Sequence, residues 1–389
     1  MDFRQTDEQR LIAETTRQIG KSFGLEYWRQ LDEKKKFPSE LWAALVDAGL
    51  TGAALPEEYG GSGLGMTEMA IIIEELAASG GGATVGQLFM IGPIFGGYSI
   101  LRFGSEAMKT DFLPRIVKGE IIALGLTEPN AGSNSLAMET FAEKVDGGWR
   151  LNGAKMWITG MDQASKILVA CRTIKAADAP KRTDGISMFL IDVKRQGLTF
   201  APIEKMGTNT LTSSNVYFDN VLIEDHELIG RLHGGWHQLV EILNSERIAT
   251  TAALVGTGRL GVQLGVDYAK ERRVFDGKPI GSYQGLQFPI AQAFIELEAA
   301  RLLNFKSSWL FDQGEPAGAE ANAAKLIAAR AAELAVDRAM QVMGGMGYAK
   351  ESHVERLWRD VRLFRIAPIA EEMVLNFVAV HNLGLPRSY

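Results

Sequence analysis

Residues 124–134 form the first stretch whose residue types could bind a ligand. They read Leu-Gly-Leu-Thr-Glu-Pro-Asn-Ala-Gly-Ser-Asn, a short apolar run followed by polar and small residues. Because Pro129 fixes φ and donates no hydrogen bond, while Gly132 lets backbone N–H groups converge, the stretch predicts a strand that runs into a ligand-facing loop.

Residues 155–160 form the second such stretch and read Lys-Met-Trp-Ile-Thr-Gly. In an extended segment, the two-residue period places Trp157 and Thr159 on one face. A flat aromatic surface beside a hydroxyl could form the wall of a site for a planar heteroaromatic cofactor. The alternative is a plain hairpin whose tryptophan packs into a core, which would explain any isolated Trp-x-Thr.

Composition and charge narrow the class of protein. The 389 residues are 46% hydrophobic and 23% charged, which predicts a soluble globular protein of two or three structural units. A net charge of −6 without a Lys/Arg cluster disfavours nucleic acid as a partner.

The single cysteine, Cys171, excludes an internal disulfide, and no metal site is expected. No apolar run reaches eighteen residues and the start lacks an apolar signal core, so we expect a cytoplasmic protein without a membrane segment.

The pattern of secondary structure changes twice along the chain. The first part has helical spacing and a capping box of Thr6 with Gln9, the middle part has short alternating runs with a hairpin turn at 146–148, and long amphipathic helices follow. The expected helices are 6–29, 38–49, 66–78, 105–117, 239–271, 284–311, 320–343 and 354–365. The expected strands are 124–127, 143–157, 167–171, 186–193 and 215–223.

The sequence resembles the FAD-dependent acyl-CoA dehydrogenases because it contains the motifs Thr-Glu-Pro-x-Ala-Gly-Ser and Lys-Met-Trp-Ile-Thr together and in this order. The resemblance covers essentially the whole chain. It implies an α+β multidomain fold with an N-terminal α-helical domain (1–120), a middle antiparallel β-barrel-like domain (121–230) and a C-terminal four-helix bundle (231–389). In that fold the flavin lies between the β domain and the helices, and a second subunit completes the site. A homotetramer, a dimer of dimers, is the assembly that the resemblance implies.

The resemblance also implies which residues bind FAD in the middle domain. In the family, the position of Thr127 bonds the edge of the isoalloxazine ring, Gly132 and Ser133 lie near the diphosphate, Trp157 covers the ring and Thr159 bonds near N5. Leu124 and Leu126 belong to the same strand and are expected at the cofactor.

A second set of FAD-binding residues is implied in the C-terminal bundle. Arg272 matches an arginine that reaches the diphosphate of the partner subunit's FAD, and a guanidinium suits phosphate oxygens because it offers a planar fork. Phe275 and Gln284 are expected near the adenosine half, although Asp276 is an extra residue relative to the family's segment. Gln341 and the Gly344-Gly345 pair match the family's Gln-x-x-Gly-Gly.

A catalytic base is needed to take the α-proton of an acyl thioester on the face away from the flavin. Many relatives carry this Glu in a Tyr-Glu-Gly-Thr segment near the C-terminus, but here Pro368 stands at the corresponding position. A minority place it on an earlier helix directly before an Arg, and the matching pair is Glu246-Arg247. The resemblance therefore implies Glu246 as the base, with Glu371 and Glu372 as alternatives displaced from the family position.

Two reaction classes remain open at this point. The first is dehydrogenation of an acyl-CoA, with a short or branched chain favoured and an electron-transfer flavoprotein as acceptor. The second is a non-redox C–S lyase that resembles 3-sulfinopropionyl-CoA desulfinase, which needs a cation for the sulfinate and no base. Retention of Glu246, and Ala83-Thr84-Val85 instead of an Arg in a glycine-rich loop, favour the dehydrogenase. The substrate-binding residues implied by the resemblance are Ser133, Leu243, Asn244 and Arg247.

Overall fold

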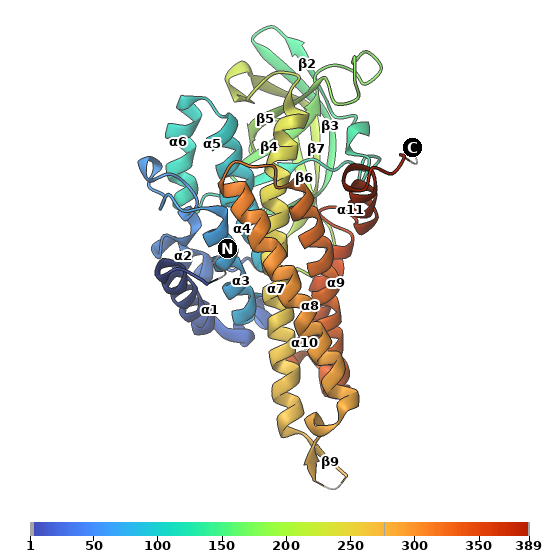
Figure 1. Cartoon of the computed structure of the whole chain (residues 1–389). Helices are drawn as coiled ribbons and strands as arrows, with labels where there is room; N and C mark the ends of the chain where they lie inside the picture. Colours follow the sequence, from blue (N-terminus) through green and yellow to red (C-terminus); the bar gives the residue numbers. More distant parts are fainter. Residues whose placement is uncertain (1–3, 276, 388–389) are drawn as a thin grey trace.

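The computed structural model describes residues 4–275 and 277–387, which form an N-terminal helical domain, a middle β domain and a C-terminal helical domain (Figure 1). This confirms the α+β fold expected from the sequence. The β domain lies at one end of the molecule, and the long helices of the C-terminal domain extend away from it (Figure 1).

The N-terminal domain begins with the predicted capping box, in which the Thr6 hydroxyl accepts from the backbone N–H of Gln9. The helix contains a break at Gly24 and ends five residues later than expected. The α-helices of this domain are α1 (Asp7–Lys34), α2 (Ser39–Asp47), α3 (Met66–Leu76), α4 (Thr84–Phe89), α5 (Ser99–Phe103) and α6 (Glu106–Val117).

The segment from α4 to α5 differs from the expectation that Ala83 to Val85 belong to a glycine-rich loop. It is helical, with a π-helical stretch at Met90–Tyr98. Its glycines permit close packing, since a Cβ on Gly86 would lie 2.8 Å from the Cβ of Ala253. The helix Thr84–Phe103 is long and apolar enough to cross a membrane by length and composition, but 89% of an apolar 18-residue window within it is buried, as in the core helix of a globular domain.

The middle domain is built on one mainly antiparallel sheet in the order β6-β7-β3-β2-β4-β5-β8, with β1 paired to β4. The predicted turn joins β2 and β3, with Gly147 in the left-handed region at φ 79°. Two pairings, β1 with β4 and β2 with β4, are parallel. The strands are β1 (Ile122–Gly125), β2 (Phe141–Val145), β3 (Gly148–Thr159), β4 (Lys166–Arg172), β5 (Ile186–Asp192), β6 (Leu198–Pro202), β7 (Ser213–Glu224) and β8 (Leu228–Ile229).

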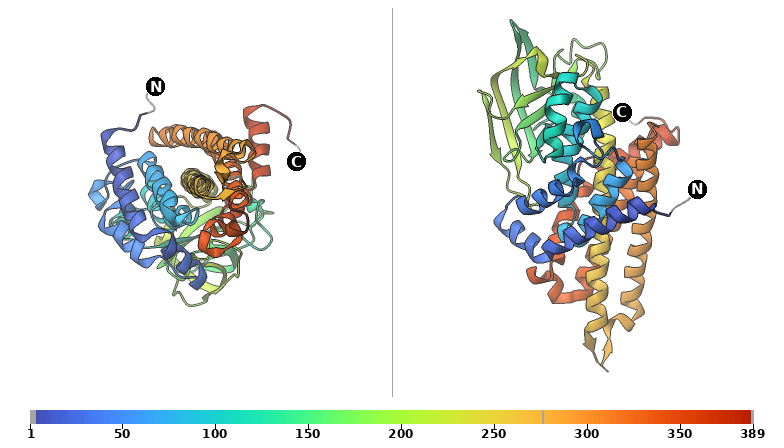
Figure 2. Two further views of the ribbon diagram at one scale, coloured as in Figure 1. Left: turned by 90° about the horizontal axis from the view of Figure 1, so that it is seen from below. Right: turned by 90° about the vertical axis from the view of Figure 1, so that its left-hand side faces the viewer.

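Helix α7 is the axis of the C-terminal domain, and in the view from below it passes through the middle of the other helices (Figure 2). Gly256 lets it approach α3, because a Cβ there would lie 2.3 Å from the carbonyl oxygen of Glu74. A small hairpin of β9 (Arg273–Val274) and β10 (Lys278–Pro279) closes the end of the bundle far from the sheet (Figure 1). The helices are α7 (Gly235–Glu271), α8 (Gln284–Asp312), α9 (Gly318–Met343), α10 (Val354–Arg362) and α11 (Glu371–Phe377).

Candidate functional site

The two stretches that carry the aromatic and hydroxyl side chains lie side by side in the β domain. The loop after β1 is joined to β3 by a hydrogen bond from the backbone N–H of Met156 to the carbonyl oxygen of Thr127, at 2.9 Å. Thr127 and Thr159 are partly buried, while 51% of Trp157 is exposed. The structure therefore brings Thr127, Trp157 and Thr159 together at one end of the sheet and leaves the indole uncovered.

A buried ion pair fixes this arrangement. The Nζ of Lys155 lies 2.7 Å from Oε1 of Glu128 and also donates to the carbonyl oxygen of Leu126 at 2.9 Å. The Glu128 carboxylate also accepts from the backbone N–H groups of Glu139 and Thr140. Burial alone would raise the pKa of Glu128, but the Lys155 charge and these hydrogen bonds hold it below its usual value.

Sequence reasoning missed the pairing of Glu128 with Lys155. Lys155 stands in a strand next to apolar residues and is fully buried, and burial lowers the pKa of its ammonium against the opposing effect of Glu128. The feature that could have predicted a buried ion pair is a lysine in a predicted strand at a position whose side chain points into the protein.

A β-bulge in β3 presents the indole of Trp157. Lys155 pairs with Val216 and Ile158 with Ser214, so β3 has one residue more than β7 between these pairs. Trp157 has φ 62°, a left-handed backbone conformation that is uncommon for a bulky residue and typically costs about 1–3 kcal/mol. Such backbone strain is concentrated at functional sites in proteins.

The loop after Thr127 leaves free space around Gly132. A Cβ built on Gly132 would meet no atom within 4 Å, and the neighbouring Ser133 is exposed. Asn134 accepts a hydrogen bond from Arg182 at 2.9 Å, which gives the amide a structural role.

Glu246 is buried on α7, with 8% of its surface exposed. Burial raises the pKa of its carboxyl to about 7, against the opposing effects of the positive charges of Arg247 and Lys325. A carboxylate with a pKa near neutrality is suited to general-base chemistry.

The residues beside Glu246 lie where α7 approaches α9, since a Cβ on Gly318 would lie 3.4 Å from Oδ1 of Asn244. Arg247 donates to Asn244 at 2.9 Å, and Leu243 is partly buried on the same helix. Among the described residues, neither the Nε of Arg247 nor the Oδ1 of Asn322 on α9 has a hydrogen-bond partner, although both atoms are buried. Because buried polar groups are normally paired, these two atoms are candidates for contacts with a ligand.

The structure argues against the alternative bases near the C-terminus. Glu371 forms ion pairs with Arg365 at 2.5 Å and with Arg330 at 3.2 Å. Its hydrogen bond with Arg365 is the main cause that lowers the pKa of its carboxyl to about 2, so it would be a weak base. Glu372 is exposed, and Pro368, which the resemblance places at the position of the usual base, has no carboxylate.

The second predicted FAD group lies at the other end of the bundle. Val342 packs against Ala269 and Ile280, so the end of α9 lies beside the β9–β10 hairpin, far from the sheet (Figure 1). One chain therefore does not bring the two predicted groups together. The residues of this second group are all exposed: Arg272, Phe275, Gln284, Gln341, Gly344 and Gly345. Asp276 lies outside the described residues.

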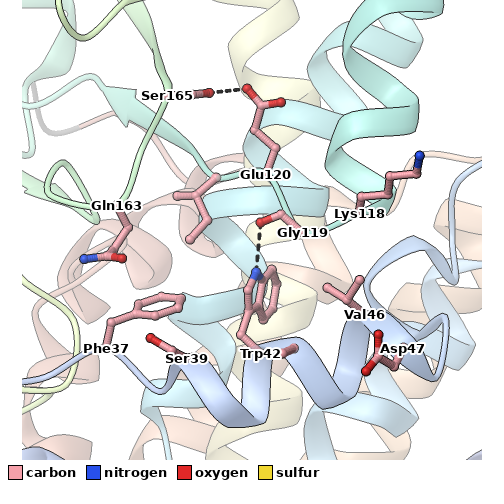
Figure 3. A pocket seen from close by; sticks show the side chains of 12 residues that line it. Phe37, Ser39, Trp42, Val46, Asp47, Lys118, Gly119, Glu120, Gln163 and Ser165 are labelled. Atoms are coloured by element: carbon pink, nitrogen blue, oxygen red, sulfur yellow. Dashed lines mark hydrogen bonds between the residues drawn. The ribbon is translucent and has the colours of Figure 1, made fainter.

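A surface pocket of about 430 Å³ lies between the N-terminal and β domains (Figure 3). Trp42 on α2 donates to the carbonyl oxygen of Gly119 in its wall, and Ser165 bonds to Glu120 (Figure 3). None of the described residues that line it belongs to the predicted site.

Thiol and metal chemistry find no support in the described part of the chain. Cys171 is fully buried, as expected, and burial raises the pKa of its thiol to about 12. The described residues contain no group of three His, Cys, Asp or Glu side chains that could hold a metal ion.

Comparison with protein families matches nearly the whole chain. Models described as acyl-CoA dehydrogenase N-terminal, middle and C-terminal domains match residues 6–120, 123–221 and 233–382. The chain is 39% identical to acyl-CoA dehydrogenase FadE12 of Mycobacterium tuberculosis (strain ATCC 25618 / H37Rv), covering 100% of this chain and 99% of that protein. It is 32% identical to glutaryl-CoA dehydrogenase of Desulfococcus multivorans, with 100% of both chains covered.

Solved structures show the same similarity in three dimensions. A glutaryl-coenzyme A dehydrogenase in complex with glutaryl-CoA has a TM-score of 0.94 and 30% identity, covering 100% of this chain and 98% of that one. Butyryl-CoA dehydrogenase from Megasphaera elsdenii has a TM-score of 0.91 and 31% identity, covering 96% of this chain and 98% of that one.

Proposed function

The chain belongs to the acyl-CoA dehydrogenase family of FAD-dependent oxidoreductases, and from this membership we propose that it oxidises the α,β carbon–carbon bond of an acyl-CoA thioester. The observation that carries the proposal is the buried carboxylate of Glu246, whose pKa burial raises to about 7. A general base works best when its pKa lies near the operating pH, because it is then both largely ionised and sufficiently basic.

In the proposed reaction, Glu246 takes the proton from Cα and the substrate loses a hydride from Cβ, so that a carbon–carbon double bond forms. Bound FAD supplies the oxidant that accepts this hydride. Arg247 and Asn244 are the proposed partners for polar groups of the thioester and the pantetheine arm. The unpartnered, buried Nε of Arg247 among the described residues supports this role. Leu243 and Ser133 complete the proposed substrate contacts.

The residues present fit FAD. Trp157 offers an exposed flat ring, and Thr127 and Thr159 offer hydroxyl groups beside it. Gly132 and Gly345 leave open space where a side chain would otherwise stand. The same proposed wall of the FAD site includes Leu124, Leu126 and Ser133. The guanidinium of Arg272 would bind phosphate oxygens of FAD.

The proposed substrate class is a short or branched acyl-CoA, and an electron-transfer flavoprotein is the proposed acceptor. Two of the similar proteins are named for the short glutaryl and butyryl groups, which supports this choice.

Anaerobic mixing of the yellow holoprotein with a panel of acyl-CoAs tests the proposal. Bleaching of the flavin absorbance by a saturated acyl-CoA is the expected result, and the fastest substrate defines the chain length. The panel includes 3-sulfinopropionyl-CoA as a second arm. Sulfite release from that compound, without bleaching by any saturated acyl-CoA, would replace the dehydrogenase assignment by the C–S lyase.

The rate of bleaching should depend on pH through Glu246. Because this base acts only when ionised, and its raised pKa is about 7, the rate should increase by about tenfold per pH unit below neutrality and level off near pH 8. Stopped-flow mixing between pH 5.5 and 9 measures this profile. A profile that is already flat at pH 6 would mean that the acting base has an ordinary carboxyl pKa.

We also propose that the protein is a homo-oligomer, with a dimer of dimers as the expected assembly. The two groups of proposed FAD-binding residues lie apart, the first in the β domain and the second at the end of the bundle far from the sheet (Figure 1), so a second copy would be needed to complete a site. Helix α8 carries exposed apolar side chains every seven residues, a stripe roughly 30 Å long that a second copy would cover. The residues of this α8 stripe are Phe288, Ile295, Leu302 and Trp309.

Ile295→Glu should dissociate the oligomer and reduce the amount of FAD that copurifies. A charge in the middle of the α8 stripe would have to be buried without a partner, which opposes association. Sedimentation velocity and the flavin-to-protein absorbance ratio measure the two effects. Leu11→Glu, at an exposed leucine of α1, is the matched control. An unchanged assembly in Ile295→Glu would show that the stripe is not an interface.

A further inference from the structure

Two neighbouring side chains join helix α10 to the β domain. Asp360, with 1% of its surface exposed, accepts a hydrogen bond from the backbone N–H of Thr208 at 2.5 Å. Arg359 donates to the carbonyl oxygen of Met206 at 2.9 Å. Both partners lie in the loop 203–212, which connects β6 with β7. The proposed reaction has given these contacts no role so far.

The part of the loop that α10 holds has a strained backbone. Thr208 is buried and has φ 52°, a left-handed conformation that is rare for a β-branched residue. Gly207 permits the close approach of α10, since a Cβ there would lie 2.8 Å from Oδ1 of Asp360. Lys205 donates to the hydroxyl of Thr208 at 2.8 Å. Because such a conformation persists only where its surroundings fix it, these contacts define the shape of the loop.

The same loop ends at the proposed flavin wall. Four positions after Thr208, the carbonyl oxygen of Thr212 accepts from the backbone N–H of Gly160 at 2.8 Å. The next residue, Ser213, pairs with Thr159 in the ladder of β3 and β7. A short run of backbone therefore connects the Asp360 carboxylate with the strand end that carries the Thr159 hydroxyl.

We propose that Asp360 is a positioning residue, which fixes the Thr159 hydroxyl for its contact with the flavin through the loop 203–212. The inference rests on the proposed FAD site, in which this hydroxyl meets the ring. Hydrogen-bond donors at the ring stabilise the electron-rich reduced flavin, so a displaced hydroxyl makes the reduction potential more negative. Asp360 thus tunes the flavin from another domain without touching it.

The reduction potential of the bound flavin in Asp360→Ala tests the inference. We expect a potential more negative than that of the native protein, shifted in the same direction as in Thr159→Val. The double variant should match Thr159→Val alone, because both changes act through the same hydroxyl and their effects are then not additive. Spectroelectrochemical titration of the four holoproteins measures these shifts.

Thr208→Gly provides a rescue, because glycine enters the left-handed region without strain and the loop then depends less on α10. Adding Thr208→Gly to Asp360→Ala should return the potential towards the native value. If Asp360→Ala does not fold or does not retain FAD, Asp360→Asn is the second variant. Its amide keeps an oxygen acceptor but loses the charge, so it should give a smaller shift of the same sign.

Hydrogen–deuterium exchange gives a readout that needs neither turnover nor flavin. In Asp360→Ala, peptides covering residues 157–164 and 203–212 should exchange about tenfold faster than in the native protein, as expected when one buried hydrogen bond is lost. Faster exchange in 203–212 alone would mean that Asp360 stabilises only the loop, and the inference would be wrong.

Asp312→Ala is the matched control. Asp312 on α8 is also a carboxylate that accepts hydrogen bonds from the backbone of another domain, from the N–H groups of Met66 at 2.6 Å and Thr67 at 3.0 Å. Its loss should speed exchange at the start of α3 and leave residues 157–164 and the flavin potential unchanged. A potential shift as large as that in Asp360→Ala would overturn the inference, since any lost interdomain contact would then have the same effect.

The outcomes separate the inference from the proposed function. If Thr159→Val shifts the potential and Asp360→Ala does not, the inference is wrong and dehydrogenation stands. If both variants shift it as expected but no acyl-CoA bleaches the native protein, the positioning role stands and the proposed function is wrong.

Discussion

Glu246→Gln should lower the rate of flavin bleaching by the best acyl-CoA by roughly 10²- to 10⁴-fold, the range that general bases contribute. The amide keeps the size of the side chain but cannot accept the α-proton. Since the carboxyl is buried and its pKa is raised to about 7 mainly by burial, its removal eliminates a costly charge and should not destabilise the fold. Rapid anaerobic mixing with a saturated acyl-CoA measures the loss.

Two neighbouring carboxylates provide controls for this result. Glu241 lies on the same helix but pairs with Arg102 at the surface, and Glu371 is held by Arg365 and Arg330. Glu241→Gln and Glu371→Gln should each retain the rate within a few-fold. Retention of bleaching in Glu246→Gln together with its loss in Glu371→Gln would move the base to α11.

Lys155→Met should destabilise the protein by about 3–5 kcal/mol, the usual consequence of breaking a buried ion pair by removing one partner. The substitution leaves the Glu128 carboxylate buried beside backbone N–H groups without its cation, and it frees the loop that carries Thr127. Urea unfolding followed by circular dichroism measures the loss, and the flavin content should fall with it because the wall around Trp157 loosens.

A double variant and a surface variant identify the cause. Adding Glu128→Gln to Lys155→Met removes the stranded charge and should recover part of the stability. Lys144→Met, which breaks the exposed pair of Lys144 with Asp225 in the same sheet, should have a much smaller effect because water screens that pair. Equal losses in Lys155→Met and Lys144→Met would mean that burial of the first pair has no energetic consequence.

Much of the fold was predictable because its signals are local. The capping box of Thr6 with Gln9 and the turn at 146–148 depend on residues a few positions apart, and both form as expected. The segment 84–103 was not recognised as helix because its glycines and Pro93 are poor helix formers in isolation. Its helical form depends on packing against α7, where Gly86 meets Ala253.

The candidate site was also predictable only where its signals are local in the sequence. The motifs that contain Thr127 and Trp157 predicted that both residues line the same side of one site, and the structure places the two motifs beside each other. The Glu128–Lys155 pair was missed because it joins residues that are distant in sequence and because lysine is seldom fully buried.

By itself, the sequence determined the chemical parts of the protein: the motifs of the flavin wall, the Glu246-Arg247 pair and the absence of a carboxylate at Pro368. Only the tertiary structure decided how these parts can work. It buried Glu246 on α7, which raises the pKa of its carboxyl to about 7, and it tied Glu371 to two arginines. It also put the β9–β10 hairpin, which directly follows Arg272, at the end of the bundle far from the sheet that contains Trp157 (Figure 1). The physical reason is that burial and charge coupling depend on distances in space, which residue types and spacing do not specify.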